Sequence, residues 1–305
     1  ITLDGDTDMQ PDLVWIKCRS ATHFHVITDA VRGATKQIYP NDTQGEGTRA
    51  EGLTAFGSDG FTLGDEDDTN QNTATYVAWC WKESAVSGMD IVSYTGNGTD
   101  DTDISHNLSA VPKMIIVKNR DAADAWQVYH GANTAAPETD YLVLNTKDGG
   151  TTDAADRWSD EAPTSSVFTL GDADEVNTNT EAYIAYAFAP KQGFSKFGSY
   201  IGNGDADGTF VYTGFRPAFV MLKSTATATN WQIMDNKRNT YNPVDLNLKA
   251  DGTSVDEDFD IIDMLSNGFK LRYSSDANVS GKTIIFMAFA EAPFVNSEGV
   301  PCNAR

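Results

Sequence analysis

Short apolar stretches separated by polar turns follow one another along the whole chain. One stretch occurs three times with a Pro at its start and a Lys six positions later, at residues 11–17 (PDLVWIK), 112–118 (PKMIIVK) and 217–223 (PAFVMLK). A second stretch begins eight residues after each Lys, at residues 25–29, 126–130 and 231–235. Apolar runs of this length between turn residues are typical of β-strands. Each of these stretches is therefore predicted to be a strand.

The later part of the pattern repeats in the same order. The motif Phe-Thr-Leu-Gly occurs at 61–64 and 168–171, in a looser form at 269–271, and an Asn stands nine residues after each Phe. A closing apolar stretch follows at 76–81, 183–188 and 284–289. The closing stretches are apolar at successive positions, which indicates strands that are covered on both faces.

A Tyr-x-Gly-Asn-Gly motif opens the second and third copies, at 94–98 and 200–204. Asn-Gly is the strongest short signal for a hairpin turn. The first copy has no such motif before Pro11, so we expect Ile1 to start partway through a repeat and the polypeptide or its gene to extend upstream. The predicted repeats are 1–88 (incomplete at its N-terminus), 89–191 and 192–305 (with a C-terminal tail), joined by polar linkers.

The acidic residues are mostly Asp, with only 11 Glu among 44 Asp and Glu. Asp, Asn and Gly favour turns, whereas Glu favours helices. The sequence therefore predicts an all-β protein. Repeats of about 100 residues with short strands favour three tandem β-sandwiches of jelly-roll or concanavalin-like topology. A β-barrel is the alternative fold, because periodicity does not give the strand connectivity.

The quoted stretches, together with residues 29–36 (DAVRGATK), resemble a repeat domain of unknown function that is frequent in tail-fibre-like proteins of tailed bacteriophages, especially marine ones. Residues 288–305 are similar to the characteristic C-terminal ending of those proteins. The resemblance implies a virion structural protein whose C-terminus is Arg305, and it supplies no catalytic residues. Two departures stand out, because His25 replaces the Trp of the other copies and the third copy lacks Thr-Leu-Gly after its Phe.

The net charge of −22 makes nucleic acid an unfavourable partner, because phosphates are bound by clustered Lys and Arg. It suits a soluble protein in a saline or extracellular setting. No apolar run approaches the length of about 20 residues that spans a membrane. Cys18, Cys80 and Cys302 are odd in number and widely spaced, which favours neither a disulfide framework nor a zinc site; a Cys18–Cys80 bridge is the open alternative.

Signals for chemistry are weak. No nucleophile elbow and no phosphate-binding loop occurs, so we expect no enzyme, with glycan cleavage by a carboxylate pair as the open alternative. His23 and His25 would share one face of a strand, as some metal ligands do, although surface or partly buried histidines are the simpler interpretation.

Two equivalent acidic turns are candidates for a calcium site. Asp65, Asp67 and Asn70 in the first copy match Asp172, Asp174 and Asn177 in the second, and oxygen ligands at such spacing can wrap Ca²⁺. The alternative is ordinary solvated turns.

The tryptophans suggest one possible ligand contact. Trp126 and Trp231 recur at one internal position and are predicted to pack in the core. Trp158 belongs to no repeated motif, so it is the best candidate for an exposed, ligand-binding aromatic residue.

Repetition without visible chemistry, together with the resemblance, leads to a functional hypothesis. We expect an extracellular virion component, a tail fibre or receptor-binding protein that contacts other virion proteins and a host-surface glycan or protein. A homotrimer is expected from how such fibres are built. The alternatives are a capsid- or tail-decorating protein without a receptor and, with less support, a polysaccharide depolymerase.

Overall fold

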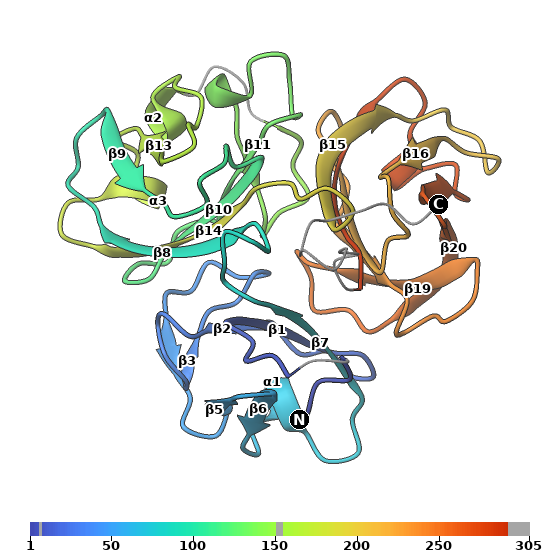
Figure 1. The fold of residues 1–305 in the computed structure, drawn as a ribbon, viewed down its shortest axis with the longest axis horizontal. Helices are drawn as coiled ribbons and strands as arrows, with labels where there is room; N and C mark the ends of the chain where they lie inside the picture. Colours follow the sequence, from blue (N-terminus) through green and yellow to red (C-terminus); the bar gives the residue numbers. More distant parts are fainter. Residues whose placement is uncertain (6–7, 151–154, 292–305) are drawn as a thin grey trace.

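The computed structural model describes residues 1–5, 8–150 and 155–291 (Figure 1). Antiparallel strands form nearly all of its regular structure, and the helices are single turns, which confirms the all-β prediction. Three groups of strands surround a common centre (Figure 1). We call residues 1–88, 89–191 and 192–305 segments 1, 2 and 3. No helix in the described part of the chain is long and apolar enough to cross a membrane.

The elements of each segment follow the order of the sequence motifs. Segment 1 contains β1 (Leu13–Cys18), β2 (His25–Asp29), β3 (Lys36–Gln37), β4 (Gly47–Thr48), β5 (Leu53–Gly57), β6 (Gly60–Leu63), α1 (Asp67–Asn70) and β7 (Tyr76–Trp81). Segment 2 contains β8 (Met89–Thr95), β9 (Thr102–Ser105), β10 (Met114–Asn119), β11 (Gln127–His130), η1 (Pro137–Thr139), β12 (Leu142–Val143), α2 (Ala155–Trp158), β13 (Val167–Leu170), α3 (Asp174–Asn177) and β14 (Ala182–Phe188). Segment 3 contains β15 (Ser195–Ile201), β16 (Phe210–Tyr212), β17 (Phe219–Ser224), β18 (Gln232–Asp235), β19 (Val244–Lys249), β20 (Glu257–Leu265), β21 (Gly268–Leu271), η2 (Asp276–Asn278) and β22 (Thr283–Phe289).

The same antiparallel pairing recurs in every segment. The strand that follows the Pro (β1, β10 or β17) lies between the second strand (β2, β11 or β18) and the closing strand (β7, β14 or β22). The repeated Lys has an equivalent cross-strand partner each time, in the pairs Lys17↔Val77, Lys118↔Ile184 and Lys223↔Ile285. Strands predicted from three separate motifs therefore occupy corresponding places.

The first strand of each sheet is buried on both faces, because alternate side chains enter two different hydrophobic clusters. The closing strands β14 and β22 are covered in the same way, as predicted, whereas β7 is covered only in part and its Ala78 is exposed. On β1, Leu13 and Trp15 enter a central cluster, whereas Val14 and Ile16 enter an outer cluster of segment 1. The central cluster also contains Met114 and Ile116 from β10, and Phe219 and Met221 from β17. One hydrophobic core is therefore shared by all three segments. This sharing explains why the strands read as uninterrupted apolar runs.

The outer layers differ between segments. In segment 3, eight strands form one continuous sheet in the order β15-β22-β17-β18-β19-β20-β21-β16. Its two ends approach each other, since Lys196 Nζ on β15 donates a hydrogen bond of 2.7 Å to Tyr212 O on β16. This sheet is nearly a barrel, whereas segments 1 and 2 hold separate smaller sheets.

Candidate functional site

Contacts between segments form a closed ring. Trp126 Nε1 of segment 2 donates to Tyr39 O of segment 1 at 2.9 Å. Trp231 Nε1 of segment 3 donates to Val143 O of segment 2 at 2.9 Å. The ring closes where His25 Nε2 of segment 1 lies 2.9 Å from Lys249 O of segment 3.

His25 replaces Trp in this ring without losing the contact. Its Nδ1 accepts a hydrogen bond from Trp15 Nε1 at 2.9 Å, so Nε2 carries the proton and donates to Lys249 O. The side chain is fully buried, and burial lowers its pKa well below the ordinary value. Trp126 and Trp231 are also buried, as predicted. These three positions hold the segments together, and none of them presents a ring to solvent.

A second ring of contacts involves the end of each second strand. Tyr186 Oη of segment 2 donates to Asp29 Oδ2 of segment 1 at 2.6 Å, and Trp79 Nε1 of segment 1 donates to Asp235 Oδ2 of segment 3 at 3.0 Å. Each carboxylate also binds a buried arginine three residues later: Arg32 Nε is 2.5 Å from Asp29 Oδ2, and Arg238 Nε is 2.7 Å from Asp235 Oδ2.

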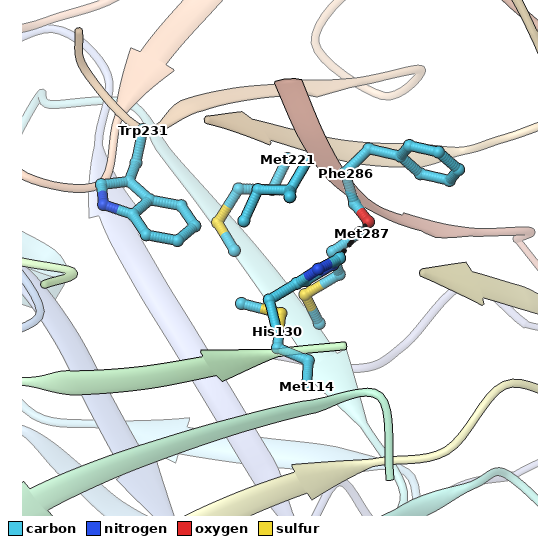
Figure 2. A pocket seen from close by; sticks show the side chains of 7 residues that line it. Met114, His130, Met221, Trp231, Phe286 and Met287 are labelled. Carbon is cyan, nitrogen blue, oxygen red and sulfur yellow. Dashed lines mark hydrogen bonds between the residues drawn. The ribbon is translucent and has the colours of Figure 1, made fainter. Parts of the chain in front are cut away.

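Segment 2 has His130 where the other segments have an Asp. Its Nε2 lies 3.2 Å from Phe286 O of segment 3, and its Nδ1 accepts a hydrogen bond from the Ala132 N–H, so Nε2 is the donor. Burial lowers the pKa of His130 to about 4, so the ring is neutral at neutral pH. Figure 2 shows Met114, Met221 and Met287 gathered around this histidine. The gap between these side chains is too small for a water molecule, so it is packed interior.

The repeated Lys residues are buried as well. Each Nζ donates to two backbone carbonyls, for example Lys118 Nζ to Asn119 O at 2.7 Å and to Ala122 O at 3.2 Å. Burial lowers the pKa of Lys17, Lys118 and Lys223 to about 8 each. The carbonyls that accept from Lys17 and Lys223 include Thr253 O and Lys147 O of the neighbouring segments. These lysines are therefore structural anchors.

An open cleft lies on the outside of segment 3. It has a volume of about 320 Å³ and lies between residues 190–196 and the end of β16. Tyr212 is 53% exposed there. Lys196 Nζ lies 5.2 Å from the centre of the Tyr212 ring, and Lys191 also lines the cleft. An accessible aromatic ring with one ammonium group beside it, in a cleft that a second lysine also lines, can bind a ligand through ring contacts and charge.

Sequence reasoning did not single out this cleft. In the structure, β16 (Phe210–Tyr212) exposes two aromatic side chains, Phe210 and Tyr212, on either side of the buried Val211. The meeting of this strand with the turn at 190–196 is a tertiary contact, which no local pattern encodes.

The structure corrects the prediction for Trp158. This residue lies in α2 and is only 2% exposed. Its ring packs edge-on against Tyr129, with ring centroids 5.9 Å apart, inside the outer cluster of segment 2. A long loop without repeat landmarks suggested exposure, but the loop folds back onto the segment and buries its one large apolar side chain. Trp158 is therefore core.

The two Asn residues among the calcium candidates hold their turns through side-chain hydrogen bonds. Asn177 is fully buried, its Oδ1 accepts the Asn97 N–H at 2.9 Å, and its Nδ2 donates to Gly171 O at 2.9 Å. Asn70 Nδ2 similarly donates to Gly64 O at 2.6 Å. Asp67 and Asp174 begin the single-turn helices α1 and α3, whereas Asp65 and Asp172 precede them.

The turns and the histidines can be compared with the side-chain clusters that bind metal ions. Within residues 1–5, 8–150 and 155–291, no group of three or more His, Cys, Asp or Glu side chains could hold a metal ion. His23 Nδ1 lies 3.2 Å from Asp68 Oδ1, while His25 points into the core, so the pair does not converge. Cys18 and Cys80 are free thiols, which overturns the alternative of a bridge between them. Cys302 and most of the 288–305 ending lie outside the described residues.

One close pair of carboxyl groups lies at the junction between segments 1 and 2. Glu83 in the first linker is hydrogen-bonded to the buried Asp90 of β8, and burial together with this bond raises the pKa of Glu83 to about 7. The carboxyls of a retaining glycosidase stand about 5 Å apart and those of inverting enzymes further. A directly bonded pair leaves no room for a sugar between its members, so its role is at the junction between segments 1 and 2.

Comparison with known proteins adds a family and no relative. No curated protein and no solved structure matches the chain. A family model described as a domain of unknown function (DUF7483) matches residues 5–293, a span that covers segment 2 and most of segments 1 and 3. The chain therefore belongs to the DUF7483 family.

Proposed function

We propose that this protein is a binding component of a phage particle, a tail-fibre or receptor-binding protein that attaches to a glycan or protein on the host surface. The observation that carries the binding role is the open cleft of segment 3, in which Lys196 lies beside the exposed ring of Tyr212 and Lys191 also lines the wall. The virion setting rests on the resemblance of the repeated motifs to phage tail-fibre-like proteins. The expected homotrimer belongs to the same proposal.

The chemistry of the cleft favours an acidic sugar. The face of a tyrosine ring packs against the C–H groups of a sugar, and an ammonium group beside it attracts a carboxylate or sulfate. The net charge of −22 repels acidic ligands elsewhere, so two lysines at one cleft mark the place where such a ligand would be tolerated. We therefore favour a host polysaccharide that contains uronic acid or sulfate groups.

The fold supports this role by making the cleft rigid. Lys196 lies on β15, which pairs with β22 along seven residues, and β22 contributes Ile285, Met287 and Phe289 to the central cluster. Binding groups on a rigid scaffold lose little conformational entropy when a ligand binds. As part of the proposal, we infer that the three segments derive from one repeated sandwich unit; their matching strand registers support this inference.

The test is binding of the full chain to immobilised neutral, uronic-acid-containing and sulfated polysaccharides. We expect saturable binding to an acidic member of the panel, and we expect Tyr212→Ala to weaken it by about tenfold or more. Tyr241→Ala is the matched control, because Tyr241 is 85% exposed and does not line the cleft. An equal loss of polysaccharide binding in both variants, or no binding to any polysaccharide or to host cells, would contradict the proposal and favour a decorating role without a receptor.

A further inference from the structure

The closing strand of segment 1 has a free edge. In segments 2 and 3 the closing strand is covered on its outer edge, β14 by β8 and β22 by β15, each along seven residue pairs. Among the described residues, no strand pairs with the corresponding edge of β7, which ends the sheet β2-β1-β7. The difference shows at Ala78, which is exposed, whereas its counterparts Ala185 and Phe286 are buried.

The covering strands end in the Tyr-x-Gly-Asn-Gly motif, and a turn of the same segment holds this motif by hydrogen bonds. In segment 2, Tyr94 Oη donates to Val176 O at 2.8 Å, and the Asn97 N–H donates to Asn177 Oδ1 at 2.9 Å. Segment 3 repeats both contacts, Tyr200 Oη to Ala277 O at 2.5 Å and the Asn203 N–H to Asn278 Oδ1 at 3.0 Å.

The glycine inside the motif is required by a close backbone approach. A Cβ on Gly96 would lie 2.2 Å from Thr178 O, and a Cβ on Gly202 would lie 2.4 Å from Val279 O. Both distances are far below van der Waals contact, and the opposing atoms are backbone. Only glycine therefore allows the strand to sit against the turn.

Segment 1 contains the same turn, at residues 67–71, but no strand among the described residues is bound to it. Tyr76 Oη donates to Asp67 O at 2.6 Å and accepts the Gln71 N–H at 2.7 Å. Tyr183 makes the same pair of bonds in segment 2, at 2.5 Å to Asp174 O and 2.8 Å from the Thr178 N–H. The turn is thus already formed.

Asn70 shows that the turn of segment 1 is uncovered. It is exposed, whereas Asn177 and Asn278 are fully buried beneath the motif. Within the described part of the chain, its Oδ1 accepts no hydrogen bond, although the same atom of Asn177 and of Asn278 accepts one from the motif.

We propose that the edge of β7 and the turn at residues 67–71 form a strand-acceptor site. Its ligand is an extended polypeptide strand that ends in Tyr-x-Gly-Asn-Gly and pairs antiparallel with β7. Such strand addition gains affinity from main-chain hydrogen bonds and specificity from side-chain pockets. The Tyr would lie against Tyr76 and reach Thr69 O, the counterpart of Val176 O, and the Asn N–H would reach Asn70 Oδ1. This site is independent of the proposed receptor cleft.

The test uses a fluorescent peptide with the sequence of residues 89–98 (MDIVSYTGNG) and the full chain. We expect saturable binding by fluorescence anisotropy. The matched control peptide carries Gly96→Val, which would clash with the turn, and we expect it to bind at least about tenfold more weakly. Equal binding of the two peptides, or binding of neither, would overturn the proposal.

Hydrogen exchange locates the bound peptide without any change to the protein. We expect the bound peptide to slow exchange in Tyr76–Trp81 and around residues 69–71, because free edge amides become hydrogen-bonded. Protection at β14 or β22 instead would mean that the peptide displaces β8 or β15, and it would contradict a site on β7.

Discussion

Segments 1 and 2 face the centre in the same way but differ on the outside. Toward the centre, both contribute alternate residues of their first strand and closing strand to one shared cluster. On the outside, segment 2 buries large side chains such as Tyr129, Trp158 and Phe168, whereas the buried residues of the outer cluster of segment 1 are Val14, Ile16, Leu53 and Phe61. The inner layer thus holds the chain together, and the outer layer is where the segments vary most.

We expect substitutions at the contacts between segments to lower the free energy of unfolding the most. Asp29→Ala removes the partner of Arg32, whose side chain has no exposed surface, and also the acceptor of Tyr186. Arg32 would keep only the longer contact of its Nη1 with Glu46 Oε2, at 3.4 Å, and removing one partner of a buried ion pair typically costs about 3–5 kcal/mol. We expect a loss of that size in the free energy of unfolding measured by urea titration.

His130→Ala is the matched change in segment 2, where the contact is neutral. It removes the hydrogen bond from His130 Nε2 to Phe286 O and should cost about 1–3 kcal/mol. A larger cost for His130→Ala than for Asp29→Ala would mean that the buried ion pairs do not govern these contacts.

The outer layers can be compared with one substitution at equivalent positions. Phe168→Ala in segment 2 should destabilise the chain by about 3–5 kcal/mol, because Phe168 is buried within a large cluster. Phe61→Ala in segment 1 should cost about 1–2 kcal/mol less, because its cluster is smaller and water can fill the space. Equal losses in urea denaturation would contradict the difference between the two outer layers.

The junction between segments 1 and 2 should show a small dependence on pH. The pKa of Glu83 is raised to about 7, so the folded chain binds this proton more tightly than the unfolded chain. The stability contributed below the unfolded pKa near 4.5 is therefore lost as the pH rises toward 7. We expect Glu83→Gln to remove that part of the slope between about pH 4.5 and 7 in urea titrations.

Two features make the Glu83 experiment interpretable. His130, with its pKa lowered to about 4, acts with the opposite sign, since its contribution is lost as the pH falls below its unfolded pKa of 6.5. The difference between variant and parent cancels this contribution. Glu51→Gln is the control for removing a carboxylate from the surface of the same segment, because Glu51 is exposed.

Much of the fold was readable from the sequence, because strands and turns are encoded locally. The three Pro-to-Lys stretches became β1, β10 and β17, and the closing stretches became β7, β14 and β22. The uninterrupted apolar pattern also indicated strands buried on both faces, which holds for β14 and β22 but only in part for β7. It did not show what lies against each face, because that depends on contacts between residues about 100 positions apart.

The functional features were less predictable for the same reason. The sequence around Trp158 does not distinguish an exposed aromatic residue from one that its own loop buries, and the structure shows it buried. The second acidic turn is held by hydrogen bonds of its Asn177 side chain, which the spacing of the acidic residues did not indicate. The cleft at Tyr212 arises where β16 meets the turn at 190–196. The free edge of β7 is visible only by comparing the strand order of the segments.

The central claim is that three segments fold around one shared core. Differential scanning calorimetry of the full chain tests it most directly. A shared core predicts a single transition, with a calorimetric enthalpy equal to the van't Hoff enthalpy. Separate transitions, or a calorimetric enthalpy about two or three times the van't Hoff value, would show that the segments unfold independently, and would contradict the account.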